Sequence, residues 1–143
     1  MKMSILTLSI FAAVCAIAAD APNDIRAVLR AQQEAWNRGD IDAFMNGYWR
    51  SDQTVFVGSE VRRGWKNVLD FYKSKYSDRE KMGTLTFSDF EITPLGPDAA
   101  LVLGSWKLDF AGGKNVHGKT TLIFRHLPEG WRIVHDHSSA ATP

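Results

Sequence analysis

The spacing of apolar residues along the chain changes near Gly83. Before that position, apolar side chains recur every three or four residues, which is typical of amphipathic helices. After it, apolar and polar side chains alternate, which is typical of strands with one buried face. The first part predicts three helices, within residues 23–36, 40–48 and 65–76, and the second predicts four strands, at residues 84–94, 99–110, 115–126 and 131–139.

This order of elements predicts the fold class, which is α+β. Strands that follow one another with only short glycine-containing turns between them favour an antiparallel meander. Amphipathic helices bury their apolar side against another element. We therefore expect the three N-terminal helices to pack on one face of a curved sheet.

Short polar segments separate the predicted helices. In the corner WNRGD, Gly39 ends the first helix and Asp40 caps the second. A short β-rich run at residues 54–57 follows the second helix. Arg62 and Arg63, just before the third helix, are interpreted as solvated loop charges, with a place at the mouth of a pocket as the alternative.

The segment GWRIVHDHSS, residues 130–139, is the last strong strand pattern and holds the densest group of polar side chains. β-branched and aromatic residues are concentrated in it and no proline interrupts it. Successive side chains in a strand point to opposite faces. Strict alternation therefore divides these side chains between two faces. One face carries Trp131, Ile133, His135 and His137, and the other carries Arg132, Val134, Asp136 and Ser138.

Length and charge narrow the class of protein. At 143 residues, of which 45% are hydrophobic, the chain fits one globular domain. A formal charge of +1 argues against a nucleic-acid-binding surface, which usually carries a basic stripe. The sequence contains no glycine-rich phosphate loop, nucleophile elbow or cysteine-based metal motif. No cofactor and no metal are therefore expected.

Residues 1–19 are expected to form a cleaved signal peptide. Lys2 precedes an apolar run, and Ala16-Ile17-Ala18 offers a small-residue cleavage site. The alternatives are a membrane anchor, for which 17 uncharged residues are at the lower limit of length, and lipidation at Cys15. Cleavage leaves a domain over residues 23–139 that is periplasmic or secreted, has no membrane contact, and has no cysteine for a disulfide.

The corner WNRGD, the two following helices and the closing GWRIVHDHSS together resemble the nuclear-transport-factor-2-like superfamily of cone-shaped α+β domains. Within it, the chain is most similar to SnoaL-like and ketosteroid-isomerase-related domains, and its ending also resembles the association domain of calcium/calmodulin-dependent kinase II. The resemblance implies a ligand pocket between the helices and the concave face of the sheet, and a homodimer through the convex face. It does not fix a function, because this fold hosts many.

Two departures from relatives limit what the resemblance implies. The association domain has arginines in its pocket, whereas the corresponding positions here are Gly104, Leu122 and Ser138, so its affinity for carboxylates does not carry over. The steroid isomerase needs a tyrosine and two acids, and this chain has Gln32, Val57 and Leu122 at the matching positions. That isomerase mechanism is not expected.

The alternation of residues 101–110 assigns the apolar side chains to the face that packs on the helices, and the resemblance assigns the same face to the pocket. The expected sheet wall of the pocket is Trp106, Leu108, Phe110, Thr120, Leu122, Phe124, Val134, Asp136 and Ser138. The helices are expected to close it with Trp36, Phe44, Tyr48 and Tyr72.

Asp136 is the main catalytic candidate. A carboxyl on an otherwise apolar wall loses solvation, which raises its pKa and suits it to proton transfer. Ser138 on the same face and the hydroxyl of Tyr48 complete an acid/base set for an enolisation, dehydration or cyclisation. The alternative is a structural aspartate paired with Arg132 or with backbone N–H groups.

The opposite face carries His117, His135 and His137, a trio that can bind zinc. The same positions fit a mixed polar and apolar dimer interface, with Arg125 and Trp131 as neighbours, and this interface is the preferred interpretation.

These features lead to two hypotheses. The first is an exported domain that binds a small apolar or aromatic molecule, with or without weak acid/base chemistry at Asp136; whether it is an enzyme stays open. The second is a non-catalytic oligomerisation or accessory module with a vestigial pocket. A cavity of several hundred cubic ångströms that contains one convergent carboxyl favours the first.

Overall fold

The computed structural model describes residues 20–141, so the predicted signal peptide and Cys15 lie outside the described residues. The helices are α1 (Ala21–Asn37), α2 (Ile41–Met45), α3 (Trp65–Lys75) and α4 (Arg79–Met82). The strands are β1 (Val55–Val57), β2 (Val61–Arg63), β3 (Thr84–Gly96), β4 (Ala99–Asp109), β5 (Asn115–Leu127) and β6 (Gly130–Ala140), with a short 3₁₀ turn at Ala111–Gly113. No helix in this described part is long and apolar enough to cross a membrane.

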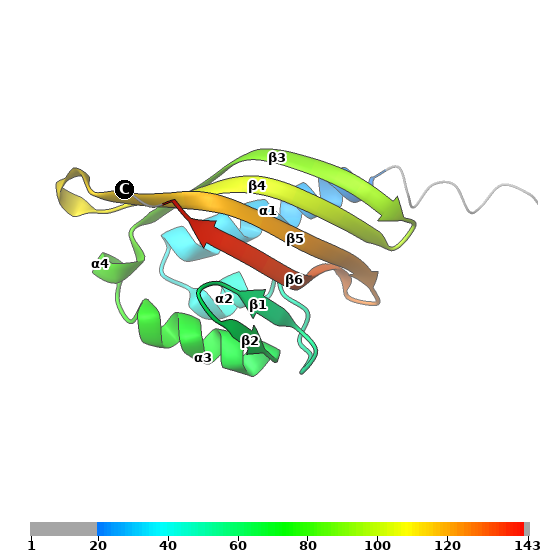
Figure 1. Cartoon of the computed structure of the whole chain (residues 1–143), viewed down its shortest axis with the longest axis horizontal. Helices are drawn as coiled ribbons and strands as arrows, with labels where there is room; N and C mark the ends of the chain where they lie inside the picture. Colours follow the sequence, from blue (N-terminus) through cyan, green and yellow to red (C-terminus); the bar gives the residue numbers. More distant parts are fainter. Residues whose placement is uncertain (1–19, 142–143) are drawn as a thin grey trace, which may run out of the picture.

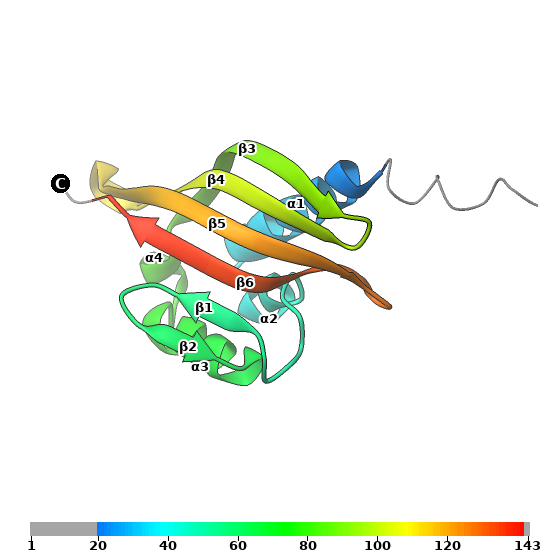
Figure 2. The same cartoon turned by 45° about the vertical axis from the view of Figure 1, so that its right-hand side comes forward.

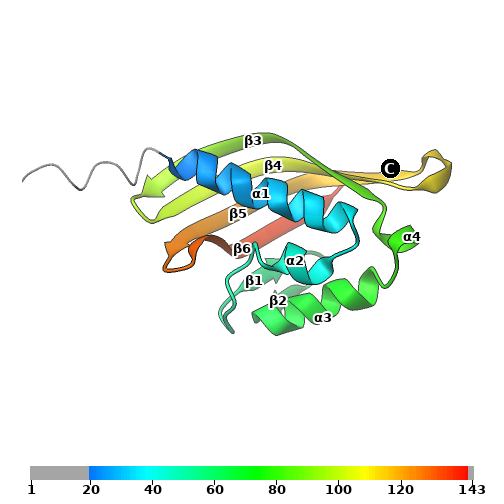
Figure 3. The same cartoon turned by 180° about the vertical axis from the view of Figure 1, so that it is seen from behind.

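The six strands form one mixed sheet in the order β2-β1-β6-β5-β4-β3. All neighbours are antiparallel except β1 and β6, which run parallel. The long strands β3 to β6 curve together, and the helices gather on their concave side (Figures 1 and 2). The view from behind shows α1 lying across this face, with α2 and α3 below it in that view (Figure 3). The expected α+β fold with helices on the concave face of a curved sheet is confirmed.

The end of α2 differs from the prediction, and two short elements were not predicted. α2 ends at Met45 rather than near Tyr48, because the chain turns there and pairs with β6: the N–H of Ile133 donates to the carbonyl of Gly47 and the N–H of Trp49 donates to the carbonyl of Ile133, both at 2.9 Å. Gly47 also lies against Gln32, where a Cβ would approach the amide to 2.5 Å. The short elements β2 and α4 were not predicted, since neither is long enough to show a period.

Strict alternation fails in β6 because Val134 is bulged. Ile123 of β5 pairs with His135, whereas the next residue, Phe124, pairs with Ile133. One extra residue in β6 reverses which side chains face inward and bends the strand. Trp131 is therefore buried in the core, 4% exposed, and cannot contribute to an outer interface as predicted, while Val134 leaves the pocket wall.

A second bulge lies in β3 at Asp89, whose φ of 56° is the only positive value among the described non-glycine residues. Before this bulge the side chains of Leu85 and Phe87 face inward, and after it those of Phe90 and Ile92 do. The ring of Phe90 lies over Gly104, where a Cβ would be 2.5 Å from that ring. These bulges give the sheet the curvature that leaves room beneath it.

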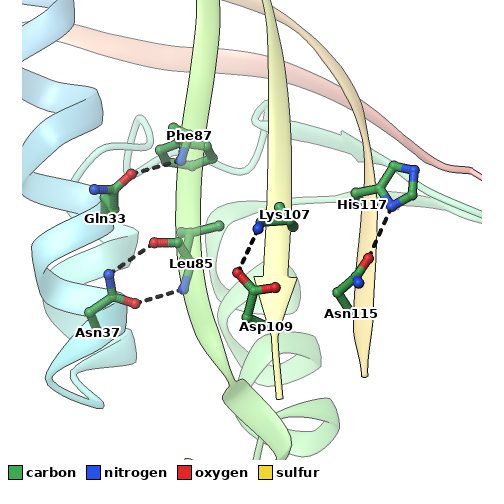
Figure 4. Close-up of polar contacts among 8 residues, drawn as sticks. All are labelled: Gln33, Asn37, Leu85, Phe87, Lys107, Asp109, Asn115 and His117. Carbon is green, nitrogen blue, oxygen red and sulfur yellow. Dashed lines mark hydrogen bonds and ion pairs between the residues drawn. The ribbon is translucent and has the colours of Figure 1, made fainter. Parts of the chain in front are cut away.

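Polar side chains of α1 hold the edge strand β3, as Figure 4 shows. The amide of Asn37 donates to the carbonyl of Leu85 at 2.9 Å and accepts from its N–H at 2.7 Å, and Gln33 accepts from the N–H of Phe87 at 2.7 Å. An edge strand otherwise presents unpaired backbone groups. These bonds replace a neighbouring strand and fix the position of α1 over the sheet.

The concave face is divided into two halves. In the closed half, the inward side chains are buried beside the N-terminal part of α1 and do not line the cavity: Ala100, Val102, Phe124 and Trp131 with Ile25 and Leu29. In the open half, at the other end of the same strands, the inward side chains line a cavity. The functional candidates lie in the open half.

Candidate functional site

The cavity has a volume of about 570 Å³ and lies between the sheet and the helices. Most of its lining is aromatic or aliphatic. From the helices and the β1–β2 hairpin come Gln32, Trp36, Phe44, Tyr48, Phe56, Arg62, Phe71, Tyr72, Lys75, Tyr76 and Lys81. From the long strands come Leu85, Phe87, Trp106, Leu108, Phe110, Val116, Thr120, Leu122, Ile133, Asp136, Ser138 and Ala140.

The structure brings most of the predicted pocket residues together around this cavity: Trp36, Phe44, Tyr48, Tyr72, Trp106, Leu108, Phe110, Thr120, Leu122, Asp136 and Ser138. Phe124 has the expected orientation but lies in the closed half, fully buried. Val134 is removed by the bulge described above. Ile133 takes its place in the wall, because the bulge turns it inward.

The helical side of the cavity is an aromatic cluster that supports itself. Trp36 makes edge-to-face contacts with Phe44, Tyr72 and Tyr76, with ring centroids 4.7–6.0 Å apart. The indole N–H of Trp36 donates to the carbonyl of Met82 at 3.1 Å, which fixes the ring. These rings pack on one another and form the helical wall of the cavity.

Asp136 lies at the floor of the cavity, 4% exposed, and its carboxyl receives hydroxyl donors on both oxygens. Tyr48 donates to Oδ2 at 2.6 Å, and Ser138 and Thr120 donate to Oδ1 at 2.7 and 3.3 Å. The hydroxyls of Tyr48 and Tyr72 are 3.4 Å apart, so the chain of polar groups extends into α3. We call these five residues the floor cluster.

The electrostatics of the floor cluster are dominated by burial. Burial raises the pKa of Asp136, and the hydrogen bonds from Ser138, Tyr48 and Thr120 oppose this rise without cancelling it. Burial also raises the pKa of Tyr48 and of Tyr72 well above the usual tyrosine value, and the nearby carboxyl adds to both shifts. The tyrosines therefore stay protonated and act as donors.

Arg132 does not pair with Asp136. Its guanidinium donates to the backbone carbonyl of Trp131 at 2.8 Å, next to the turn that precedes β6. Within residues 20–141, no ion pair reaches the Asp136 carboxyl, and its partners are hydroxyls only. The alternative of an aspartate held by Arg132 is wrong.

Two members of the floor cluster were not predicted as such. Thr120 was expected in the wall, but its hydroxyl donates to Asp136 and lies 2.9 Å from the Ser138 hydroxyl, because Thr120 is opposite Ser138 in β5 and β6. Tyr72 was expected as an aromatic wall residue. Its polar role depends on how α3 lies against α2, which no short-range sequence pattern reveals.

The outer face carries the predicted interface residues other than Trp131. His117 and His137 are exposed, His135 is half-buried, and Arg125 is exposed and paired with Asp98 at 2.9 Å. Within the described chain, no group of three histidine, cysteine or acidic side chains could hold a metal ion. The interface itself stays a prediction.

Comparison with known proteins gives a consistent result. Residues 25–143 match the family model of the SnoaL-like domain. An NTF-2 like protein of unknown function from Shewanella oneidensis MR-1 is 40% identical, with 82% of this chain and 98% of that chain covered and a TM-score of 0.79. No curated protein matches the chain significantly.

More distant structures share the fold. A nuclear transport factor 2 (NTF2-like) superfamily protein from Salmonella enterica is 18% identical over 87% of this chain and 94% of that one, with a TM-score of 0.72. A ketosteroid isomerase-like protein from Erwinia carotovora atroseptica is 20% identical over 87% and 98%, with a TM-score of 0.69.

Proposed function

The chain belongs to the SnoaL-like domain family, within the nuclear-transport-factor-2-like superfamily, and on the geometry of its cavity we propose that it binds a small apolar or aromatic molecule. One observation carries the proposal: a cavity of about 570 Å³ with a mainly apolar lining converges on a single buried carboxyl. Sites for small molecules typically have about 300–1,000 Å³ and a few polar groups among apolar ones.

The proposal includes weak acid/base chemistry at Asp136. A carboxyl whose pKa is raised by burial exchanges its proton closer to neutral pH than an exposed one does. Tyr48 donates to the ionised carboxyl at 2.6 Å, and when Asp136 takes a proton from carbon this hydroxyl is released to donate to a substrate oxygen. This combination suits an isomerisation, dehydration or cyclisation.

One observation favours the rival hypothesis, a non-catalytic module with a vestigial pocket. Within the described residues, every buried side-chain nitrogen or oxygen already has a hydrogen-bond partner. The floor cluster is therefore satisfied without a ligand, as a purely structural group would be. The size of the cavity supports the binding function instead, because a vestigial pocket is normally filled by side chains.

Binding can be tested with N-phenyl-1-naphthylamine, a neutral aromatic dye that fluoresces in apolar sites. We expect one dye per chain, and we expect Leu108→Trp, which fills the cavity from β4, to abolish binding. Leu95→Trp is the matched control, because Leu95 is 59% exposed and lies outside the cavity. Equal binding by wild type and Leu108→Trp, or no binding by wild type, contradicts the proposal, provided that circular dichroism shows both variants folded.

Acid/base competence can be tested by carbon NMR titration of the Asp136 carboxyl. We expect a pKa above the ordinary aspartate value of about 3.9. A lowered pKa, together with an Asp136→Asn variant that loses stability but keeps dye affinity, would support the rival module. Native mass spectrometry of protein purified from its own host would then show what the cavity carries.

We also propose a homodimer through the outer face of the sheet. Leu103 is 43% exposed there, and the half-buried Ile123 and His135 pair across β5 and β6. Apolar side chains among polar ones are typical of such interfaces. Light scattering at micromolar concentration should show a dimer. Replacing His135 and His137 by serine should weaken this dimer. A wild-type monomer contradicts the proposal.

Export completes the proposal. It rests on the charged, apolar and small-residue parts of residues 1–19. N-terminal sequencing of protein from the periplasm or medium should begin at or near Ala19. An intact Met1 in that fraction would contradict it.

A further inference from the structure

The charged residues that line the cavity are distributed unevenly. Three are cations, Arg62 from β2, Lys75 from α3 and Lys81 from α4, whereas Asp136 is the only acid among the lining residues. Lys75 and Lys81 are exposed and Asp136 is buried, so the cations lie at the opening and the acid lies at the floor. We call Arg62, Lys75 and Lys81 the rim.

Two rim cations are placed around one aromatic ring. The guanidinium carbon of Arg62 is 3.9 Å from the ring centroid of Phe71, and Nζ of Lys75 is 5.6 Å from the same centroid. Lys75 is also 5.3 Å from the ring centroid of Tyr76. Phe71 and Tyr76 both line the cavity, so aromatic contacts hold these two charges beside its apolar wall.

The rim cations differ in how far acids of the chain neutralise them. Lys81 is held by Asp78 at 3.3 Å and by the Ser77 hydroxyl at 2.8 Å. The Arg62 guanidinium is bound on one side by Glu60 at 2.9 Å. Lys75 forms no ion pair with any acid in residues 20–141. Arg62 and Lys75 therefore keep donors for a further anionic group.

The burial of Arg62 is the second indication. Its side chain is 24% exposed, while that of its partner Glu60 is 72% exposed. An arginine that serves only to solubilise a surface keeps its charge in water. Here the guanidinium is drawn toward the cavity and its acid is left outside, which favours a ligand group of opposite charge at the opening.

We propose that the ligand is an amphipathic anion, with an apolar or aromatic body in the cavity and one carboxylate or sulfonate-like group between Arg62 and Lys75. This inference rests on the proposed binding function and adds the charge of the ligand. The body extends toward the floor cluster, where the Tyr48 and Ser138 hydroxyls donate to Asp136 and can accept from a hydroxyl of the ligand. A cavity with cations at its opening also attracts anions from solution.

The test compares two dyes that share one aromatic skeleton. N-phenyl-1-naphthylamine is neutral, and 1-anilinonaphthalene-8-sulfonate carries an added sulfonate. We expect the wild type to bind the sulfonate about tenfold more tightly, as expected for a charge-assisted contact, and this preference to shrink with added salt. The Arg62→Gln/Lys75→Gln variant should lose about tenfold in affinity for the sulfonate and keep its affinity for the neutral dye.

Lys66→Gln is the matched control, because Lys66 lies on the same helix α3, is exposed, and does not line the cavity. It should change neither affinity. Equal affinity of the wild type for both dyes overturns the inference while leaving the binding function intact. An equal loss for both dyes in the double variant also overturns it, because the cations would then act only by packing on Phe71. Failure of both dyes to bind the wild type overturns the binding function as well.

Discussion

The closed and open halves of the concave face are built on the same strands, yet one is filled and the other holds a cavity. In the closed half, the aliphatic residues Ile25 and Leu29 of α1 are buried with Val102 and Phe124. In the open half, the helical side is made of large aromatic rings that contact one another. Branched aliphatic side chains fill the space above a sheet, whereas rings that stack edge to face can hold it open. The difference assigns stability to one half and binding to the other.

We expect the largest difference in stability between alanine variants of two phenylalanines on the same face. Phe124 in the closed half is 0% exposed, and Phe87 in the open half is half-buried and lines the cavity. We expect Phe124→Ala to cost about 3–5 kcal/mol of unfolding free energy and Phe87→Ala about 1–2 kcal/mol, because less apolar area is lost. Urea unfolding measures both. Equal costs would mean that the open half is packed as tightly as the closed one.

A smaller effect should appear when side chains are enlarged. Val102 and Leu122 are paired across β4 and β5, but only Leu122 lines the cavity. We expect Val102→Leu to destabilise by about 1–3 kcal/mol through overpacking, and Leu122→Phe to change stability little while weakening binding of the neutral dye. Thermal unfolding and dye titration of both variants check this. A stable Val102→Leu variant would show that the closed half contains unfilled space.

The sequence predicted the fold and the open half better than the site within it. The alternation in residues 101–110 assigned Trp106, Leu108 and Phe110 to the cavity, because β4 has no bulge in that region. It failed in β6, where one extra residue at Val134 moves Trp131 into the core. A bulge changes hydrogen bonding without a distinct residue type, so alternation cannot locate it.

The site was predicted in part. Asp136, Ser138 and Tyr48 meet as expected, since Asp136 and Ser138 share one face and Tyr48 is brought beside β6 by the bridge to Ile133. The rim does not follow from the sequence: the pattern leaves Arg62 as a loop charge or a residue at a pocket mouth, and it gives Lys75 no role. Its geometry depends on Phe71 in α3 contacting β2, a tertiary contact between separate elements.

The smallest effect should distinguish the halves by their response to pH. The closed half is apolar, whereas the open half contains Asp136, the one buried carboxyl in residues 20–141. Burial raises the pKa of Asp136 in the folded protein, so the folded state keeps a proton that the unfolded chain has already lost. The contribution of Asp136 to the unfolding free energy of the wild type is greatest below the unfolded pKa of about 3.9, and it falls as pH rises through the folded pKa.

Asp136→Asn removes this loss, so we expect the variant to gain stability relative to wild type as pH rises from about 3.9 through the folded pKa, and the difference to level off above it. Each unit of pKa difference corresponds to about 1.4 kcal/mol. Asp78 and Asp89 have lowered pKa values, through hydrogen bonds from the backbone of Lys81 and from the side chain of Ser105 respectively, and act in the opposite direction. Both are present in wild type and variant and cancel in the difference.

Phe124→Leu, in the closed half, should leave the pH slope unchanged. A difference between Asp136→Asn and wild type that stays flat or falls with pH would mean that the Ser138, Tyr48 and Thr120 hydroxyls hold an ionised carboxylate, and the open half would then differ from the closed half only in packing.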